Sequence, residues 1–121
     1  MVNKHTILVV DDEPDIRTAM RSELSVHGYE VLAASDGEQA MQTLTGQKVD
    51  VVLLDINMPR ANGFKVLEFI KSKSLPSKVI MLSANADLNN VFKAKHLDAH
   101  DFISKPYTVE EVLSAITRVL K

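Results

Sequence analysis

The sequence predicts an α/β protein of the (βα)₅ type, in which five parallel strands, each followed by a helix, form one doubly wound sheet. Short apolar runs alternate with segments whose apolar residues recur every three or four positions. The runs Thr6–Val10, Val49–Leu54 and Val79–Leu82 are almost continuously hydrophobic, as is typical of strands covered on both faces. A chain of 121 residues has the usual size of one domain, so residues 1–121 are expected to form a single unit.

The polarity of the runs also predicts the order of the strands. The three most apolar runs belong in the centre of the sheet, and the two shorter, more polar runs belong at its edges. Parallel neighbours need crossover connections, which are right-handed in nearly all proteins. This arrangement gives the flavodoxin-like order 2-1-3-4-5. The five predicted strands are Thr6–Val10, Val31–Ala34, Val49–Leu54, Val79–Leu82 and Phe102–Ile103.

Five apolar stripes at helical spacing follow the strands. Pro14 suits the first turn of the first helix. The pairs Ser35 with Glu38 and Thr108 with Glu111 have the spacing of capping boxes at the second and fifth helices. The fourth stripe is the thinnest, so its helix is expected to be the least firmly anchored. The stripes are Ile16, Ala19, Met20, Leu24; Ala40, Met41, Leu44; Gly63, Val66, Leu67, Ile70; Leu88, Val91, Phe92; and Val109, Val112, Leu113, Ile116, Leu120.

Composition excludes several classes of function. Hydrophobic residues make up 45% of the chain and charged residues 25%, which are ordinary globular values. A net charge of −2 gives no general drive toward nucleic acid. The absence of cysteine excludes disulfides and thiolate metal sites. Because no apolar run approaches the roughly 20 residues that cross a bilayer, we expect no membrane span and a cytoplasmic location.

Charged side chains stand where strands are predicted to end. Asp11 and Asp12 follow the first strand, Asp55 follows the third, and Lys105 follows the fifth. In open parallel sheets the carboxyl ends of the strands meet at one edge, so these groups should converge. Three carboxylates carry a charge of −3, which Mg²⁺ and one lysine would neutralise. The pattern therefore predicts a magnesium site with phosphoryl chemistry, to which a backbone carbonyl near Asn57 would add an oxygen ligand.

Each of these residues also has a simpler interpretation. Asp12 alone would suit the cap of a helix, and Asp55 alone would suit a turn after a strand. Ser83, at the end of the fourth strand, would serve equally as a cap or as a donor to a phosphoryl oxygen. The coincidence of all the strand ends favours a joint site, with Asp55 as a nucleophile that forms an aspartyl phosphate. The Lys105–Pro106 bond is a candidate cis peptide, although X–Pro bonds in general favour trans.

The chain resembles a response-regulator receiver domain of two-component signalling over essentially its whole length. The stretches that carry the resemblance are Ile7–Pro14, Val51–Pro59, Ser83–Ala84 and Phe102–Pro106. Any one of them alone is a weak signal, and the four together are highly specific. One position departs from the family pattern, since Asp98 stands where glycine usually follows the fourth helix.

The resemblance implies a role for each site residue. It implies that Asp55 accepts a phosphoryl group, and that Asp11 and Asp12 organise Mg²⁺ together with the backbone carbonyl of Asn57. It further implies that Lys105 binds the phosphoryl oxygens. The same resemblance makes Ser83 a second phosphoryl ligand and Phe102 the aromatic residue of the switch.

The resemblance also implies partners and a mode of action. The donor would be a histidine kinase or a histidine phosphotransfer protein, and the output domain or protein is unknown. Phosphorylation adds charge and acceptor oxygens at Asp55. Ser83 would move toward them, Phe102 would turn inward, and the surface of the fourth helix, fifth strand and fifth helix would change. We expect a switch rather than a turnover enzyme, acting as a monomer or as a weak phosphorylation-dependent dimer without contacting nucleic acid directly.

Rival functions lack their own signatures. A phosphatase with an aspartyl nucleophile needs a second acid two residues later, and that position is Asn57, an amide. A flavodoxin-like cofactor protein needs a phosphate-binding loop after the first strand, where this chain has two carboxylates. A receiver-like module that only binds would have lost an acid or the lysine. His96 and His100 have the spacing of helical metal ligands, but the fourth helix is predicted to end between them.

Overall fold

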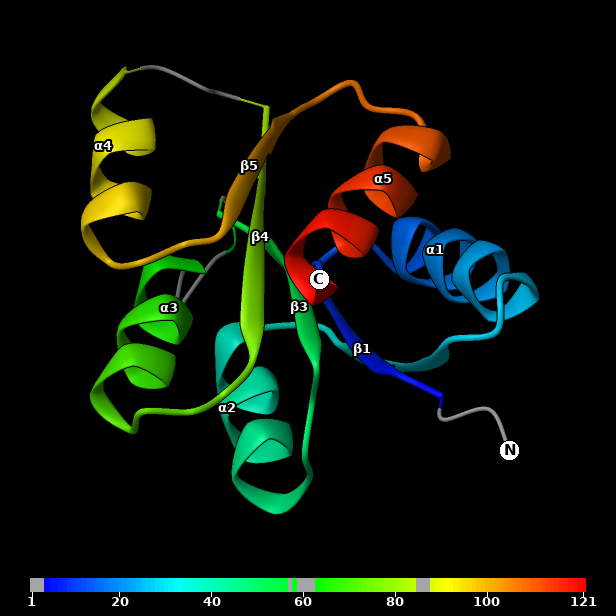
Figure 1. Cartoon of the computed structure of the whole chain (residues 1–121), viewed down its shortest axis with the longest axis horizontal. Coiled ribbons are helices and arrows are strands. Elements are labelled where there is room, and N and C mark those ends of the chain that lie inside the picture. Colours follow the sequence, from blue (N-terminus) through cyan, green and yellow to red (C-terminus); the bar gives the residue numbers. More distant parts are fainter. Residues whose placement is uncertain (1–3, 57, 59–62, 85–87) are drawn as a thin grey trace.

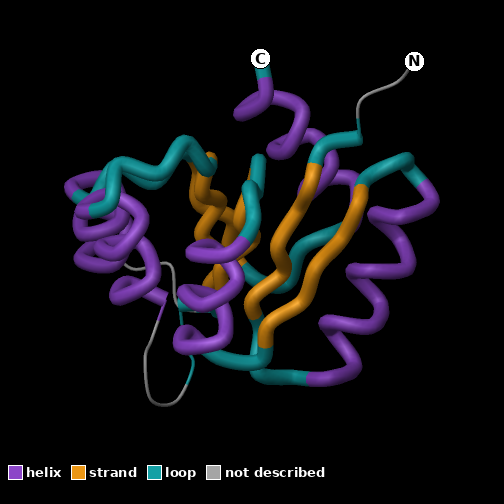
Figure 2. The backbone as a smooth tube through the Cα atoms, turned by 90° about the horizontal axis from the view of Figure 1, so that it is seen from below, coloured by secondary structure: helices purple, strands orange, loops and turns teal. Residues whose placement is uncertain are grey.

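The computed structural model describes residues 4–56, 58, 63–84 and 88–121. These residues form the predicted fold, a five-stranded parallel sheet in the order β2-β1-β3-β4-β5 with helices on both faces (Figures 1 and 2). The expected edge positions of the second and fifth strands are confirmed. The strands are β1 (Thr6–Val10), β2 (Glu30–Ala34), β3 (Val51–Asp55), β4 (Lys78–Ser83) and β5 (Asp101–Ser104).

The five helices divide between the two faces of the sheet. Helices α2, α3 and α4 lie on one face, and α1 and α5 lie on the other (Figure 1). This division is the geometry of a doubly wound sheet with right-handed crossovers. The helices are α1 (Pro14–Val26), α2 (Gly37–Gly46), α3 (Gly63–Ser72), α4 (Leu88–His96) and α5 (Val109–Leu120).

Each face of the sheet has its own apolar core. Successive side chains of a strand point to opposite faces, so each central strand supplies both cores. All five residues of β3 are buried, as the continuous apolar run predicts for a central strand. One core joins Leu8, Val10, Val52, Leu54 and Met81 to α2, α3 and Ala94 of α4. The other joins Ile7, Val9, Val51, Leu53, Ile80 and Leu82 to α1 and α5.

The helix starts agree in part with the capping predictions. Pro14 is the first residue of α1, and Thr108 and Glu111 form a complete capping box at α5. The predicted capping box of Ser35 and Glu38 is wrong. Asp36 is the N-cap of α2, and its side chain accepts a hydrogen bond from the backbone N–H of Gln39 at 2.8 Å. Ser and Asp are both good N-cap residues, and here the helix begins one residue later than predicted, after Asp36 instead of after Ser35.

The predicted helix faces hold for α2, α3 and α5, but need correction on two other helices. Phe92 does not lie in the apolar stripe of α4, since 64% of its surface is exposed. The buried side chain is Ala94, three residues after the partly buried Val91, so the covered face of α4 runs through these two residues. The side chain of Leu88 falls outside the described part. Ala19 of α1 is also exposed, and it borders an open apolar hollow beside Ile16.

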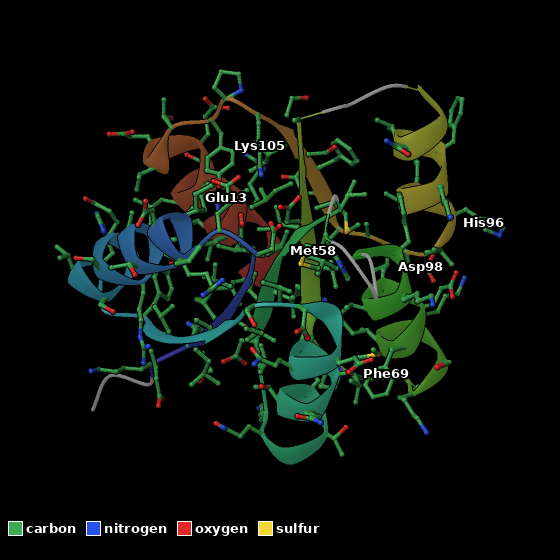
Figure 3. The ribbon with its side chains drawn as sticks, turned by 180° about the vertical axis from the view of Figure 1, so that it is seen from behind. Glu13, Met58, Phe69, His96, Asp98 and Lys105 are labelled. Carbon is green, nitrogen blue, oxygen red and sulfur yellow. The ribbon has the colours of Figure 1, made fainter. Side chains whose placement is uncertain are left out.

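The chain leaves α4 through a left-handed residue, where the family pattern has glycine. Asp98 has a φ of 66°, and Asp tolerates this conformation better than most residues. Its carboxylate lies 3.4 Å from the ammonium of Lys71, so it also contacts the end of α3 (Figure 3). Among the described residues, none of the helices is both long and apolar enough to span a bilayer.

Candidate functional site

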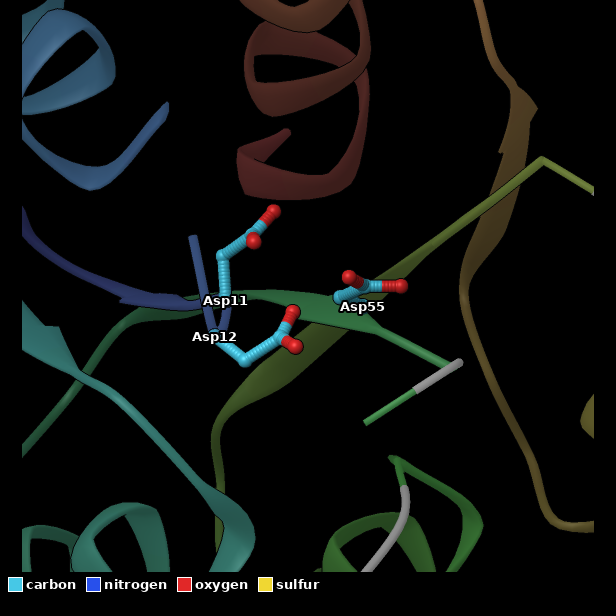
Figure 4. A group of neighbouring side chains, drawn as sticks. All are labelled: Asp11, Asp12 and Asp55. Carbon is cyan, nitrogen blue, oxygen red and sulfur yellow. The ribbon is translucent and has the colours of Figure 1, made fainter. Parts of the chain in front are cut away.

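Three carboxylates converge at the carboxyl end of the sheet. One oxygen each from Asp11, Asp12 and Asp55 can be chosen so that all lie within 4.8 Å of one another (Figure 4). Asp11 and Asp12 are neighbours whose side chains would diverge in an extended strand. Both reach the same place because β1 ends at Val10 and the chain turns immediately toward α1. The convergence predicted from the strand ends is therefore present.

Asp11 is held from several sides and is almost completely buried, with 1% of its surface exposed. Its backbone N–H donates to the carbonyl of Ala34 at 3.1 Å, and its Oδ1 accepts from the backbone N–H of Glu13 at 2.9 Å. Its Oδ2 is buried without a hydrogen-bond partner among the described residues. Burial, together with the charges of Asp55 and Asp12, raises the pKa of the Asp11 carboxyl group. A cation bound at this oxygen would favour the ionised carboxylate and so oppose that shift.

Asp12 has a different environment, since it is exposed and lies at the open side of the cluster. The alternative that Asp12 caps α1 is not supported, because the N-cap residue is Glu13, whose side chain makes no capping hydrogen bond. Its position is that of a ligand accessible from solvent.

Asp55 is the last residue of β3, and only 3% of its surface is exposed. Lys105 Nζ lies 3.4 Å from Asp55 Oδ2 and 3.9 Å from Asp11 Oδ2. Lys105 follows β5, and Figure 3 shows it at the same end of the molecule as Glu13. Its backbone N–H donates to the carbonyl of Ser83 at 2.7 Å, and the bond to Pro106 is cis. One ammonium therefore bridges two buried carboxylates.

Gly63 gives α3 a close approach to the backbone of Asp55. A Cβ atom at this position would lie 2.6 Å from the Asp55 carbonyl oxygen and 2.9 Å from Ile56 Cα. The Gly63 N–H also donates to the Ile56 carbonyl at 3.3 Å. Only a residue without a side chain allows this contact, so the glycine fixes the end of β3 against the start of α3.

The remaining predicted site residues lie around this centre. Ser83 is the last residue of β4 and is completely buried, one strand away from Asp55. Phe102 of β5 is partly buried and packs against the core beneath α4. It lines a hollow of ≈ 180 Å³ on the α4 side and another of ≈ 410 Å³ on the α5 side. Asn57, the predicted carbonyl ligand, lies outside the described residues.

Two residues near the acids were missed by the sequence argument. Tyr107 is partly buried; its burial, and then the charges of Asp11, Asp55 and Glu13, raise the pKa of its phenol to about 12. Arg17 of α1 donates from Nη1 to the backbone carbonyl of Asp11 at 2.7 Å. A tyrosine two residues after the predicted lysine and an arginine six residues after the first acid are too common in sequences to have identified either contact.

An apolar hollow of ≈ 550 Å³ lies beside the acid cluster, between α1 and the segment after β5. Lys105 belongs both to this hollow and to the charged centre. The hollow is lined by Ile16, Ala19, Met20, Glu23, Ala84, Lys105, Pro106, Tyr107 and Val109.

The donor set fits a magnesium ion. Mg²⁺ prefers hard oxygen ligands and keeps several waters, so a site of two or three carboxylates open to solvent on one side suits it. The buried Asp11 Oδ2, which lacks a hydrogen bond, and the raised pKa of Asp11 are what a cation would relieve. Asp11, Asp12 and Asp55 are the residues that would hold the ion.

The end of α4 separates His96 from His100, and neither belongs to the cluster of possible metal ligands found among the described residues. His96 is the last residue of α4, and His100 follows the left-handed turn. His100 Nδ1 accepts a hydrogen bond from the backbone N–H of Val79 at 3.1 Å, while the His100 N–H donates to the Val79 carbonyl at 2.8 Å. Its ring nitrogen therefore extends the pairing with β4 at the start of β5.

Comparison with known proteins assigns the chain to one family. The family described as the response regulator receiver domain matches residues 7–117, and the chain belongs to that family. Such domains are signalling switches of two-component systems rather than turnover enzymes. Members typically bind Mg²⁺ at an acidic pocket and interact with histidine kinases, and some are attached to DNA-binding output domains.

Two relatives illustrate the similarity in sequence. The chain is 38% identical over 118 residues to the probable transcriptional regulator ycf27 of Guillardia theta, covering 98% of this chain and 46% of the relative. It is 33% identical over 115 residues to the alkaline phosphatase synthesis transcriptional regulatory protein PhoP of Bacillus subtilis, covering 95% and 48%. The chain thus spans about half the length of these curated relatives.

Solved structures agree with the fold. The chemotaxis protein CheY4 of Vibrio cholerae superposes with a TM-score of 0.92 at 28% identity, over 97% of this chain and 99% of that one. The response regulator TrrA of Thermotoga maritima, solved in complex with Mg²⁺-BeF, gives a TM-score of 0.85 at 32% identity, over 95% and 98%.

Proposed function

We propose that this domain, taken as one unit over residues 1–121, accepts a phosphoryl group on Asp55 from a histidine kinase or a histidine phosphotransfer protein. The observation that carries the proposal is the position of the Asp55 carboxylate. It ends the central strand, lies 3.4 Å from the Lys105 ammonium and shares one site with Asp11 and Asp12. A buried carboxylate with a cation beside it is suited to attack on phosphorus.

In the proposed reaction, an Asp55 carboxylate oxygen forms a bond to the phosphorus of a phosphohistidine. The bond between phosphorus and the imidazole nitrogen breaks, and its electron pair stays on that nitrogen. When bound, Mg²⁺ supplies positive charge for the acids and the transferring oxygens. Asp11, Asp12, Asp55 and the carbonyl of Asn57 are its proposed ligands. Lys105 would contact the new phosphoryl oxygens as a point charge, and Ser83 would donate its hydroxyl to them.

The phosphoacceptor is tested with a small donor. With Mg²⁺ and acetyl phosphate, the wild-type chain should gain one phosphoryl group, observed by intact-mass spectrometry and removed by hydroxylamine. Asp55→Asn should gain none, because an amide cannot form the acyl phosphate. Unchanged hydroxylamine-sensitive labelling of that variant would place the nucleophile elsewhere. A wild type that binds Mg²⁺ but is never labelled would favour the alternative of a receiver-like binding module.

We also propose that phosphorylation changes the surface formed by α4, β5 and α5. Phe102 of β5 lies between two hollows, so space exists on either side of its strand for the ring to move. Lys105 follows the same strand and bridges to Asp55. Moving a two-state equilibrium from about 1:99 to 99:1 requires about 5.5 kcal/mol. A few charge-assisted hydrogen bonds of about 1.5–3 kcal/mol each would supply it.

Amide hydrogen exchange tests this output. Phosphorylation of the wild type should alter exchange mainly within residues 83–107. The change should shrink in Ser83→Ala, because the hydroxyl that senses the phosphoryl group is gone while Asp55 is intact. Exchange that changes only in α1 and α2, or equally in both proteins, would contradict the route.

A further inference from the structure

Asp11 is fixed at three points, two on its backbone and one on its side chain, and one of its three partners is a charged side chain. The N–H bonds to Ala34 of β2, and Oδ1 accepts from the N–H of Glu13. The carbonyl oxygen, which the sheet does not use, accepts from Arg17 Nη1 at 2.7 Å. With these three contacts made, Oδ2 is left buried beside Asp12 and Asp55.

Arg17 is well placed to hold this carbonyl. It lies in the first turn of α1, where its own N–H donates to the carbonyl of Glu13 at 3.1 Å. Side chains of a helix lean toward its N-terminus, so the guanidinium reaches back over the turn to the end of β1. The contact ties the helix to the strand across the three residues Asp11, Asp12 and Glu13.

The hydrogen bond from Arg17 holds the main chain of Asp11 in place and does not pair with its carboxylate. The charged groups that influence the Asp11 carboxyl are Asp55, Lys105 and Asp12, and Lys105 is the cation that lies 3.9 Å from its Oδ2. Arg17 instead bonds the main chain and is only partly buried. Loss of its side chain would leave the charges of the site in place and free the loop that carries two of the three acids.

We propose that Arg17 is a positioning residue for the magnesium site, holding the turn after β1 so that Asp11 and Asp12 face Asp55. The inference rests on the proposed function of that site. Partners that orient metal ligands typically change metal affinity by about 10–100-fold when they are removed.

The test compares Mg²⁺ affinity in four proteins by isothermal titration calorimetry. Arg17→Met keeps an unbranched stem but removes the donors and the charge, and should weaken Mg²⁺ binding by about 10-fold or more. Arg17→Lys keeps a donor and a charge and should recover part of the affinity. Arg21→Ala is the matched control, because Arg21 lies one turn later on α1, is exposed, and makes no hydrogen bond or ion pair with another described residue. It should bind Mg²⁺ as the wild type does.

A second readout separates positioning from folding. Urea unfolding without Mg²⁺ reports the stability of each variant, and a merely structural role would lower it while leaving the Kd for Mg²⁺ unchanged in the folded protein. That result, or equal affinities in Arg17→Met and the wild type, would overturn the inference. If Arg17→Met does not fold, Arg17→Gln decides, because its shorter side chain does not reach as far toward the Asp11 carbonyl: an affinity equal to that of the wild type overturns the positioning role. A wild type that binds no Mg²⁺ would instead overturn the proposed function itself.

Discussion

Helices α3 and α4 cover the same face of the sheet, but the sequence anchors them very differently. In α3 five residues are buried, and Gly63 sits directly against the backbone of Asp55. In the described part of α4, Ala94 is the one buried side chain, and Phe92 is exposed. Its side-chain contacts with α3 are polar or charged: the Lys93 ammonium lies 4.6 Å from the centre of the Phe64 ring, and Lys71 of α3 donates to the His96 carbonyl at 3.1 Å.

The difference matches what a switch needs from its two regions. The region that holds the phosphoacceptor must keep its geometry, so it is built on a buried strand and a close-packed helix. A region that changes conformation must cost little to rearrange, so few apolar contacts should hold it. The α4 part of the proposed output surface is a region of the second kind.

The largest expected effect contrasts how firmly α3 and α4 are anchored in the core that they share. Leu67 of α3 is 1% exposed, so Leu67→Ala should lower the free energy of unfolding by about 3 kcal/mol through lost burial and a cavity. Phe92→Ala on α4 should change it by no more than about 0.5 kcal/mol, because the ring already faces solvent. Urea denaturation measures both. Similar losses in the two variants would remove the contrast.

A second expected effect concerns the contact between α3 and the site. Gly63→Ala would place a methyl group 2.6 Å from the Asp55 carbonyl oxygen, and the neighbouring atoms are backbone that cannot turn aside. We expect a loss of about 2 kcal/mol in unfolding free energy, with slower labelling of Asp55 by acetyl phosphate. The control is Gly46→Ala at the end of α2, where a Cβ would meet nothing within 4 Å. Equal stability of the two variants would show that the close approach is unimportant.

The smallest effect concerns the connection between α4 and β5. Partial burial of the ring, followed by the charge of Lys78, lowers the pKa of His100 below its usual value of 6.5, while Asp98 opposes the shift. The neutral ring accepts the Val79 N–H through Nδ1, which an imidazolium cannot do. The folded state therefore binds fewer protons than the unfolded state. This contribution is complete above about pH 6.5 and is lost as pH falls through the lowered pKa.

The expected size of that loss is about 0.5 kcal/mol, because His100 is exposed and water can replace the missing acceptor. Urea denaturation at about pH 7.5 and pH 5.5 measures it, above and below the ordinary pKa of histidine. His100→Asn retains an acceptor that does not titrate, so it should remove this component of the pH dependence. The same slope in both proteins would assign the effect to other groups.

The sequence alone determined the architecture and the place of the chemistry. Strands covered on both faces are apolar throughout, so the continuous apolar runs indicated the central strands. Strand β1 has the predicted bounds Thr6–Val10. The other strands differ by one or two residues at their ends. Because parallel strands end at one edge, the positions of Asp11, Asp55 and Lys105 after apolar runs were enough to predict that they meet.

Local details were less predictable where neighbouring residues compete for one role. Asp36 caps α2 in place of Ser35, and since Ser and Asp are about equally good N-caps, their types alone do not say which of the two begins the helix. On α4 the larger Phe92 suggested a buried face, but the small Ala94 lets the helix approach the core. A short apolar stripe does not define which side of a helix is covered.

Only the tertiary structure decided how the acids are held. The hydrogen bond from Arg17 to the Asp11 carbonyl joins a side chain to the main chain across a turn, and no residue pattern encodes such a contact. In the sequence, Gly63 is one residue of a predicted helix stripe. Only the structure shows that it packs directly against the backbone at the end of β3. The sequence places charges at the ends of strands through periodicity, a local property. The burial of one oxygen, the hydrogen bond to one carbonyl and the close backbone contact are different in kind. They arise only when segments far apart in the chain meet in space.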